Sequence, residues 1–317
     1  MIALVKGKDG FNPILKNKRH VSNMRIREGF VGYLFASPWL IGFFVFTLYP
    51  MLTSLYYSFT TYNLAQAPKW IGWANYQILF TRDTLFYTAL FNTFYYAVFS
   101  VPLVLVMGVF VAILMNQKIR GMQLIRTIYY MPNVVSIVAV SLLWQMIFQG
   151  NYGLINNVLG MIGIRGPGWL TDPNWAKPAL IIMSCWNAGS AMVIYLAGLQ
   201  GIPRVYYEAA EIDGASVFGR FFRITLPLLS PSIFFNLVMG IINAMQVFSQ
   251  AFIMTNGGPM NSTTFYVFML YKKAFADMRM GYASSMAWIL LLMTLLLTLL
   301  VFRFVGRRVY YETGDNK

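Results

Sequence analysis

The sequence has little charge for its length and almost none of the residues that metal and redox chemistry uses. Its 317 residues include 10 Asp and Glu, one histidine and one cysteine, and charged residues make up 11% of the total, whereas soluble domains carry about 25%. A single cysteine, Cys185, excludes a disulfide within this sequence, and His20 is the only histidine available to a haem or metal. We therefore expect no metal site, no bound cofactor and no catalytic residue.

The sequence also lacks an energy source of its own. It contains no GxxxxGK[ST] phosphate-binding loop, so any nucleotide chemistry belongs to another polypeptide. Ion-driven transporters commonly hold ionisable side chains within the membrane, and the long apolar segments here contain none. Polar side chains or backbone carbonyls could still bind sodium, so a secondary carrier or channel for small polar solutes stays an alternative. A membrane-embedded enzyme or scaffold would need intramembrane ionisable residues or metal ligands, and these are missing.

What the sequence does have is apolar length. Hydrophobic residues make up 58% of it, and about 20 consecutive apolar residues suffice to cross roughly 30 Å of hydrocarbon. Six segments meet that length, at residues 29–57, 86–115, 128–148, 178–199, 226–254 and 283–302. None of the six contains Asp, Glu, Lys, Arg or His. The sequence therefore predicts an all-α membrane protein with six transmembrane helices.

The distribution of Lys and Arg predicts the orientation, because cytoplasmic loops retain these residues. With the amino terminus inside, only seven of the 24 basic residues fall in outer loops, and the other 17 fall in the tails and inner loops. Residues 1–28 are basic but lack the apolar core and cleavage site of a secretory signal, so we interpret them as a retained cytoplasmic tail. Residues 307–317 are expected to form a second cytoplasmic tail, with the membrane domain at 29–306 between the two.

One interior stretch, residues 203–227, is charged and amphipathic, and we call it the elbow. Pro203 suits a helix start, because its missing amide hydrogen is one that a first helical turn leaves unpaired. Asp213 and Gly214 predict a corner at which glycine adopts positive φ. Phe221 and Phe222 follow, and clustered exposed aromatic residues usually have a partner. The elbow is therefore a candidate docking surface on the same side as both termini.

The elbow also carries a specific pattern, EAAxxDGAxxxxxFxxIxLP. Its members are Glu208, Ala209, Ala210, Asp213, Gly214, Ala215, Phe221, Ile224, Leu226 and Pro227. This pattern resembles the cytoplasmic signature loop of the permease subunits of bacterial ABC importers, in the MalF/UgpA-like carbohydrate branch. Runs such as Gly72, Asn75 and Tyr76, and Thr255, Gly257, Gly258 and Pro259, are similar to the same branch. The resemblance covers roughly residues 33–304.

The resemblance implies a fold, a function and partners. The fold would be that of a type I ABC importer permease, and the elbow would be the coupling loop that docks on an ATPase, with Phe221 and Phe222 giving apolar area and Glu208 an ion pair or cap. The chain would be a transport subunit rather than an enzyme, carrying an oligosaccharide, polyol or sugar phosphate. Its partners would be a second homologous permease, two ATPase subunits that hold ATP and Mg²⁺, and an extracytoplasmic solute-binding protein. The location would be the bacterial inner or plasma membrane.

Candidate solute contacts lie in the fourth and fifth predicted spans. Asn236, Asn243 and Gln250 recur every seven residues, with Gln246 close to the same face. Such amides can present the donors and acceptors that a sugar hydroxyl needs. The alternative is that they bind neighbouring helices, as polar residues in membranes routinely do. Asn187 and Ser190 are weaker candidates. In importers of this type, the solute site lies between two permeases near the same two spans.

Overall fold

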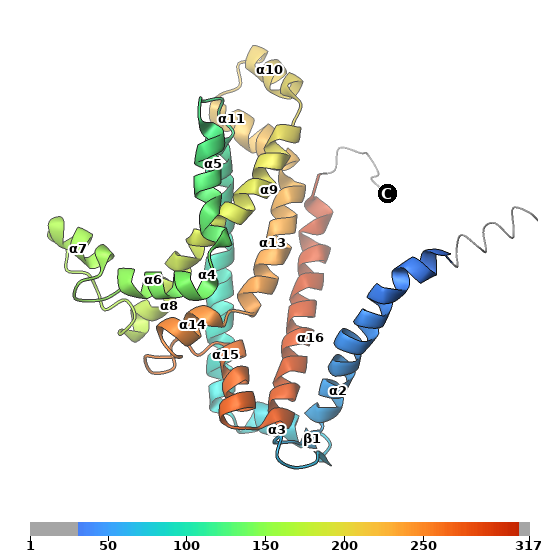
Figure 1. Ribbon diagram of the computed structural model, residues 1–317. Coiled ribbons are helices and arrows are strands. Elements are labelled where there is room, and N and C mark those ends of the chain that lie inside the picture. The colour runs from blue at the N-terminus through green and yellow to red at the C-terminus, as the bar shows by residue number, and fades with distance from the viewer. Residues whose placement is uncertain (1–30, 311–317) are drawn as a thin grey trace, which may run out of the picture. The chain divides into compact units, whose positions relative to one another are not determined.

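The computed structural model describes residues 31–310, which are mostly helical (Figure 1). The predicted tail at residues 1–28 lies outside the described residues, and so does most of the predicted tail at 307–317, from residue 311 onward. The chain divides into two compact units, one up to Tyr56 and one from Tyr57 onward. The first unit contains most of a long helix, Val31–Ser58, with a π-helical stretch at Phe44–Leu48 followed by α2 (Tyr49–Ser58). Its large side chains, such as Trp39 and Phe46, are exposed on the isolated chain, as expected of a helix that lies in lipid.

The second unit is built around α4 (Thr84–Met115), a 32-residue helix. At 1.5 Å per residue it extends to about 48 Å, more than the hydrocarbon thickness requires. Asp83 caps its first turn by accepting from the amides of Leu85 and Phe86. At its other end, Arg126 donates two hydrogen bonds to the Met115 carbonyl, at 3.0 and 2.6 Å. These contacts satisfy backbone groups that a helix leaves unpaired at its ends.

Two further helices lie along α4, namely α9 (Ala188–Gly201) and α13 (Ser230–Met245). Gly108 permits the close approach of α9, because a Cβ at this position would lie 2.9 Å from the Ala191 Cβ and 3.0 Å from the Tyr195 ring. Small residues serve this purpose in membrane helix interfaces, where close packing is a main source of association. The last long helix, α16 (Met280–Phe304), contacts α13.

Two of the six predicted spans are not continuous helices. The third consists of α5 (Met122–Tyr130), a 3₁₀ turn at Met131–Val134 that contains Pro132, and α6 (Ile137–Ile147), with a bend of 98°. The fifth bends by 65° at Leu229, and α13 then ends at Met245, before α14 (Ser249–Met254). Within residues 31–310, four helices are therefore long and apolar enough to cross a membrane, or up to six if each bent pair is one span.

The remaining elements are short. They are the strands β1 (Thr60–Thr61) and β2 (Lys69–Trp70), which pair antiparallel, and the helices α3 (Ala74–Thr81), α7 (Leu154–Met161), α8 (Pro173–Ser184), α10 (Arg204–Ile212), α11 (Val217–Arg220), α12 (Leu226–Leu228) and α15 (Tyr266–Tyr271). Additional turns are the 3₁₀ stretches Cys185–Asn187 and Gly306–Arg308 and the π-helical stretches Phe221–Thr225 and Lys272–Ala276.

A hydrogen-bond network around Asn92 joins α4 to the turn that precedes α15. The buried Asn92 amide donates to the carbonyls of Asn261 and Thr264, at 2.9 and 3.1 Å, and accepts from Lys177 Nζ at 2.9 Å. Next to this network, the Tyr266 hydroxyl donates to the Met286 carbonyl at 2.9 Å. Burial raises the pKa of the Tyr266 phenol, so the group stays a neutral donor.

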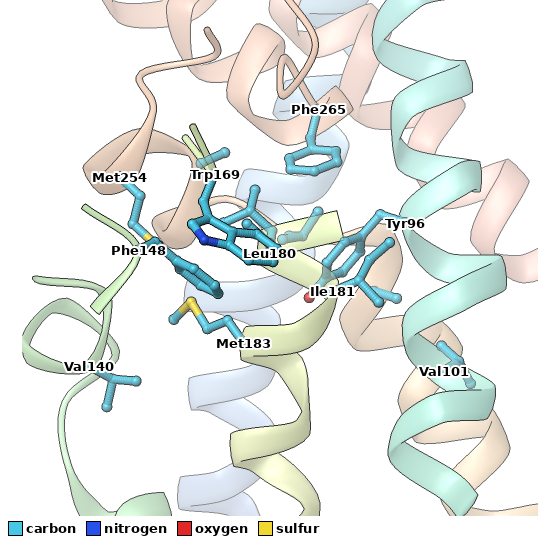
Figure 2. Packing of buried hydrophobic residues seen from close by; sticks show 14 residues of the cluster. Tyr96, Val101, Val140, Phe148, Trp169, Leu180, Ile181, Met183, Met254 and Phe265 are labelled. Atoms are coloured by element: carbon cyan, nitrogen blue, oxygen red, sulfur yellow. The ribbon is translucent and has the colours of Figure 1, made fainter. Parts of the chain in front are cut away.

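Aromatic packing fills the core between α4, α8 and the segments around α6 and α14. Figure 2 shows Phe148 and Trp169 beside Leu180 and Met183, with Tyr96 of α4 on the other side. The Trp169 indole donates to Asn156 Oδ1 at 2.7 Å, so this large ring is buried without losing its hydrogen bond. The packing holds α8 against α4 and thereby fixes one wall of the cavity described next.

Candidate functional site

A cavity of about 490 Å³ lies between α4, α9 and α13, and we call it the amide-lined cavity. Its polar lining residues are Tyr96, Ser100, Asn133, Ser184, Asn187, Ser190, Asn236, Asn243, Gln246, Ser249 and Gln250. Apolar walls come from residues such as Phe235, Met239 and Phe248. Ligand sites for small molecules have this character, because a few polar groups fix orientation within a mostly apolar wall. No lining residue is Asp, Glu, Lys, Arg or His.

The structure brings all six predicted solute residues to this one cavity. Asn187 and Ser190 reach it from the junction of α8 and α9, and the other four reach it from α13 and the segment beyond. The hydrogen bonds that Asn236 and Ser190 donate are local, from Asn236 Nδ2 to the Ser232 carbonyl and from Ser190 Oγ to the Asn187 carbonyl, both at 2.9 Å. Neither bond crosses to another helix, so these two side chains do not serve to join helices through the bonds they donate.

The end of α13 shapes this cavity in a way that helical periodicity could not show. Asn236 and Asn243 lie on α13, but that helix ends at Met245, so Gln246 is the residue that caps it, and Gln250 lies on α14. The three residues Gln246–Phe248 turn the chain, and Phe248 leaves helical geometry at φ −142°. Interrupted membrane helices are tolerated where the freed backbone lines a cavity, and transporters commonly bind solutes at such breaks.

Several lining residues were not predicted from the sequence. Tyr96 and Ser100 are four residues apart on α4, and this spacing within an apolar helix was a usable signal for one polar face. Ser184 lies three residues before Asn187, so helical spacing was a usable signal for it too, whereas Asn133, beside Pro132, gave no comparable signal. Asn133 enters the cavity through the bend between α5 and α6, and that bend is itself not visible in hydropathy.

The second candidate site is the elbow, where the chain turns sharply after α10. Gly214 has φ +73°, and the amides of Asp213 and Ala215 donate to the carbonyls of Ala209 and Ala210 at 3.0 and 2.9 Å. Glycine in this left-handed conformation is a common helix end, since it carries no Cβ penalty. Ser216 then begins α11 by accepting from the Gly219 amide. The elbow therefore has the predicted corner at Gly214.

Two contacts hold the halves of the elbow together. The hydroxyls of Tyr207 and Thr225 lie 2.9 Å apart, and Arg220 forms an ion pair with Glu211 at 3.4 Å. The Glu211 side chain is 70% exposed, so the solvent screens this pair and it contributes little. The Tyr207–Thr225 hydrogen bond, with Thr225 buried, is the firmer link between α10 and the segment that leads into α13.

The exposed apolar surface of the elbow is wider than Phe221 and Phe222. Ile212, Phe218 and Phe222 are exposed, whereas Phe221 is half-buried and packs edge-to-face on Phe222 at 5.0 Å. The side chains of the signature pattern divide between exposed and half-buried positions: Glu208, Ala209 and Asp213 are exposed, and Ala210, Ala215, Leu226 and Pro227 are half-buried. One face of α10 is therefore exposed, and Glu208 lies on that face.

Comparison with known proteins agrees with this arrangement. The family described as the binding-protein-dependent transport system inner membrane component matches residues 104–308. A probable ABC transporter permease protein of Bacillus subtilis (strain 168), YesP, is 44% identical over 294 residues, which cover 92% of this chain and 95% of that protein. The lactose transport system permease protein LacF of Rhizobium radiobacter is 39% identical, over 86% of this chain and 92% of that protein.

A solved structure is similar over almost the same length. It is a bacterial alginate ABC transporter in complex with an alginate pentasaccharide-bound periplasmic protein, and the matched chain has a TM-score of 0.80, 25% identity and coverage of 92% of this chain and 98% of that chain. The predicted all-helical fold of a type I importer permease is thereby confirmed. Because the family match covers more than half of the chain and the relatives align along nearly all of it, the chain belongs to the binding-protein-dependent transport system inner membrane components, the multi-pass permease subunits of ABC transporters.

Proposed function

We propose that this permease subunit imports a carbohydrate and that the solute passes through the amide-lined cavity. The lining of that cavity is the observation that carries the proposal. Amides and hydroxyls supply both donors and acceptors, as sugar hydroxyls require, and the absence of charge among the lining residues suits a neutral polyhydroxyl segment. Relatives named for lactose, trehalose/maltose and sulfoquinovosyl glycerol support a carbohydrate as the solute class.

The elbow and the amide-lined cavity are joined by α13. This helix follows the elbow after one short turn, α12, and its far end carries Asn243 and the break at Gln246. A displacement of the elbow is therefore transmitted along α13 to the residues that line the cavity. In this mechanism the elbow docks on a partner ATPase, and closure of two ATPase subunits around ATP and Mg²⁺ switches the cavity between outward and inward access. This chain binds no cofactor itself.

The remaining partners are those that the resemblance to carbohydrate importers implies. A second homologous permease completes the solute path, and an extracytoplasmic solute-binding protein delivers the solute. The alginate transporter supports the outside partner, since its structure is a complex with an alginate pentasaccharide-bound periplasmic protein. The excess of Lys and Arg in the tails and inner loops supports an orientation with both termini and the elbow in the cytoplasm.

An uptake assay tests the solute path. The complex is reconstituted in vesicles with its ATPase subunits and binding protein, and ATP-driven uptake of radiolabelled oligosaccharides is compared between wild type and Asn243→Ala. Loss of one hydrogen bond is worth about 0.5–1.5 kcal/mol, so we expect uptake to fall about twofold to tenfold. Leu295→Ala is the control, because Leu295 is exposed on α16 and does not line the cavity. Equal uptake by Asn243→Ala and wild type for every transported sugar would contradict the proposal.

A further inference from the structure

A second, larger cavity of about 990 Å³ lies where the elbow meets α4, and we call it the elbow cavity. From α4 it is lined by Pro102, Leu105, Val106, Val109, Phe110 and Ile113. From the elbow it is lined mainly by Phe218, Phe221, Phe222 and Leu226. Its volume is at the upper end of the roughly 300–1,000 Å³ that ligand sites occupy. The proposed import mechanism uses the elbow for docking on the ATPase but assigns no occupant to this cavity.

The elbow cavity opens away from the amide-lined cavity. Residues along a helix are about 100° apart, so Val106 and Val109 lie about 120–180° around α4 from Ser100 and Val104, which line the amide-lined cavity. Leu105 is the wall that the two cavities share. Val106, Phe110 and Phe222 are each more than half exposed, so the opening faces the outside of the helix bundle. Solute in transit would not enter here.

The position along α4 decides what can fill this cavity. Pro102 to Ile113 is the half of the membrane-crossing helix that leads to the elbow, so the opening faces hydrocarbon. Water held there would lack the two to four polar partners that a buried water needs. Lipid is the solvent at this depth, and an acyl chain fills an apolar hollow without leaving hydrogen bonds unmade.

The rim at the elbow end is polar and basic. Asn116 and Arg220 line the cavity there, and the exposed Lys118 and Arg120 follow Asn116 along the chain. Arg220 already contacts Glu211, but that carboxylate is largely exposed and its pairing is weak. Basic clusters beside membrane helices on the cytoplasmic side attract anionic lipid headgroups. An apolar body with a cationic rim matches the two parts of an anionic phospholipid.

We infer that the elbow cavity binds an anionic phospholipid of the inner leaflet, with an acyl chain along Val106 and Phe110 and the headgroup beside Arg220. This assignment rests on the proposed orientation only for the choice of leaflet. Because α4 and the elbow both line the elbow cavity, the bound lipid contacts the elbow, which docks on the ATPase in the proposed mechanism. It also contacts α4, which lines the amide-lined cavity as well. The site thus links membrane composition to the position of the elbow.

Native mass spectrometry of the intact transporter complex in mild detergent tests the inference, with phosphatidylglycerol and phosphatidylethanolamine added separately as probes. No solute or ATP is present, so the result is independent of the transport proposal. We expect wild type to retain phosphatidylglycerol in preference to phosphatidylethanolamine. Val106→Trp places an indole in the cavity and should abolish retention of both lipids at this site. Leu295→Trp adds the same ring to an exposed position outside the cavity and should change nothing.

Arg220→Gln tests the headgroup contact without changing the part of the cavity that holds the acyl chain. It keeps the test valid if Val106→Trp fails to assemble. Each basic residue near an anionic surface contributes a factor of about five, so the preference for phosphatidylglycerol should fall about fivefold in this variant. Unchanged lipid retention in Val106→Trp, or equal retention of the two lipids by wild type, would overturn the inference. Loss of a permease subunit from Val106→Trp without loss of lipid would assign the cavity to a protein partner and would also overturn it.

Discussion

Replacement of Gly214 by valine is the sharpest perturbation of the elbow, because the structure separates its conformational cost from any steric cost. Gly214 has φ +73°, and a Cβ built on it meets no atom within 4 Å. A β-branched residue rarely adopts this left-handed backbone conformation, and sparsely populated backbone conformations cost about 1–3 kcal/mol each. The cost falls on the corner of the elbow alone.

The expected effect is loss of coupling rather than loss of the protein. A cost of about 2 kcal/mol lowers the population of the working elbow about 30-fold, whereas domains are stable by about 5–15 kcal/mol. Gly214→Val should therefore reach the membrane at wild-type levels and lose most of its solute-stimulated ATP hydrolysis and uptake in reconstituted vesicles. Gly214→Asn should keep more activity, since asparagine tolerates positive φ.

Gly219→Ala is the matched control for this series. Gly219 lies in α11 of the same elbow, its φ is not positive, and a Cβ there would make an ordinary contact with Ser216 Oγ at 3.4 Å. We expect near wild-type coupling from this variant. Full transport by Gly214→Val, or equal defects in Gly214→Val and Gly219→Ala, would refute the role of the corner.

Three further predictions concern the contacts that support the sites. Tyr207→Phe removes the 2.9 Å hydrogen bond to Thr225, so ATPase coupling should fall by a factor of about two to ten. In a Thr225→Val background, which already lacks this bond, Tyr207→Phe should cause no further loss of coupling. Gly108→Leu overpacks the contact with Ala191 and should destabilise the fold by about 1–3 kcal/mol or more, seen as a lower Tm in detergent, whereas Gly42→Ala should not. Asn92→Leu leaves the carbonyls of Asn261 and Thr264 without its amide, and because the bond to Thr264 is buried its loss should cost about 1–3 kcal/mol; proteolysis should then cut faster near residues 255–264, and unchanged protection would contradict that role.

The apolar segments show how far the sequence alone could reach. The predicted span at residues 86–115 agrees closely with α4, and the last predicted span, 283–302, lies within α16. Hydropathy sets these lengths directly, because the thickness of the bilayer is fixed. It carries no information on direction, so the 98° bend after Pro132 and the 65° bend at Leu229 did not follow from it.

The candidate sites show a similar division. Periodicity placed Asn236 and Asn243 on one face, as α13 has them, but it also assumed that the helix continues through Gln250. The chain breaks at Gln246, and only the tertiary fold brings Gln250 to the same cavity as Asn187. At the elbow, positive φ at Gly214 followed from the residue type, whereas the half-burial of Phe221 depends on packing.

The most direct test of the importer mechanism is purification of this chain from its native membrane, followed by uptake into vesicles with and without ATP. We expect an ATPase to co-purify with the wild-type chain. It should no longer co-purify with the Glu208→Lys variant, since Glu208 lies on the exposed face of α10. Uptake should require both ATP and the binding protein. A chain that purifies alone and moves solute without ATP would contradict the mechanism. It would favour the alternative that this chain is a secondary carrier.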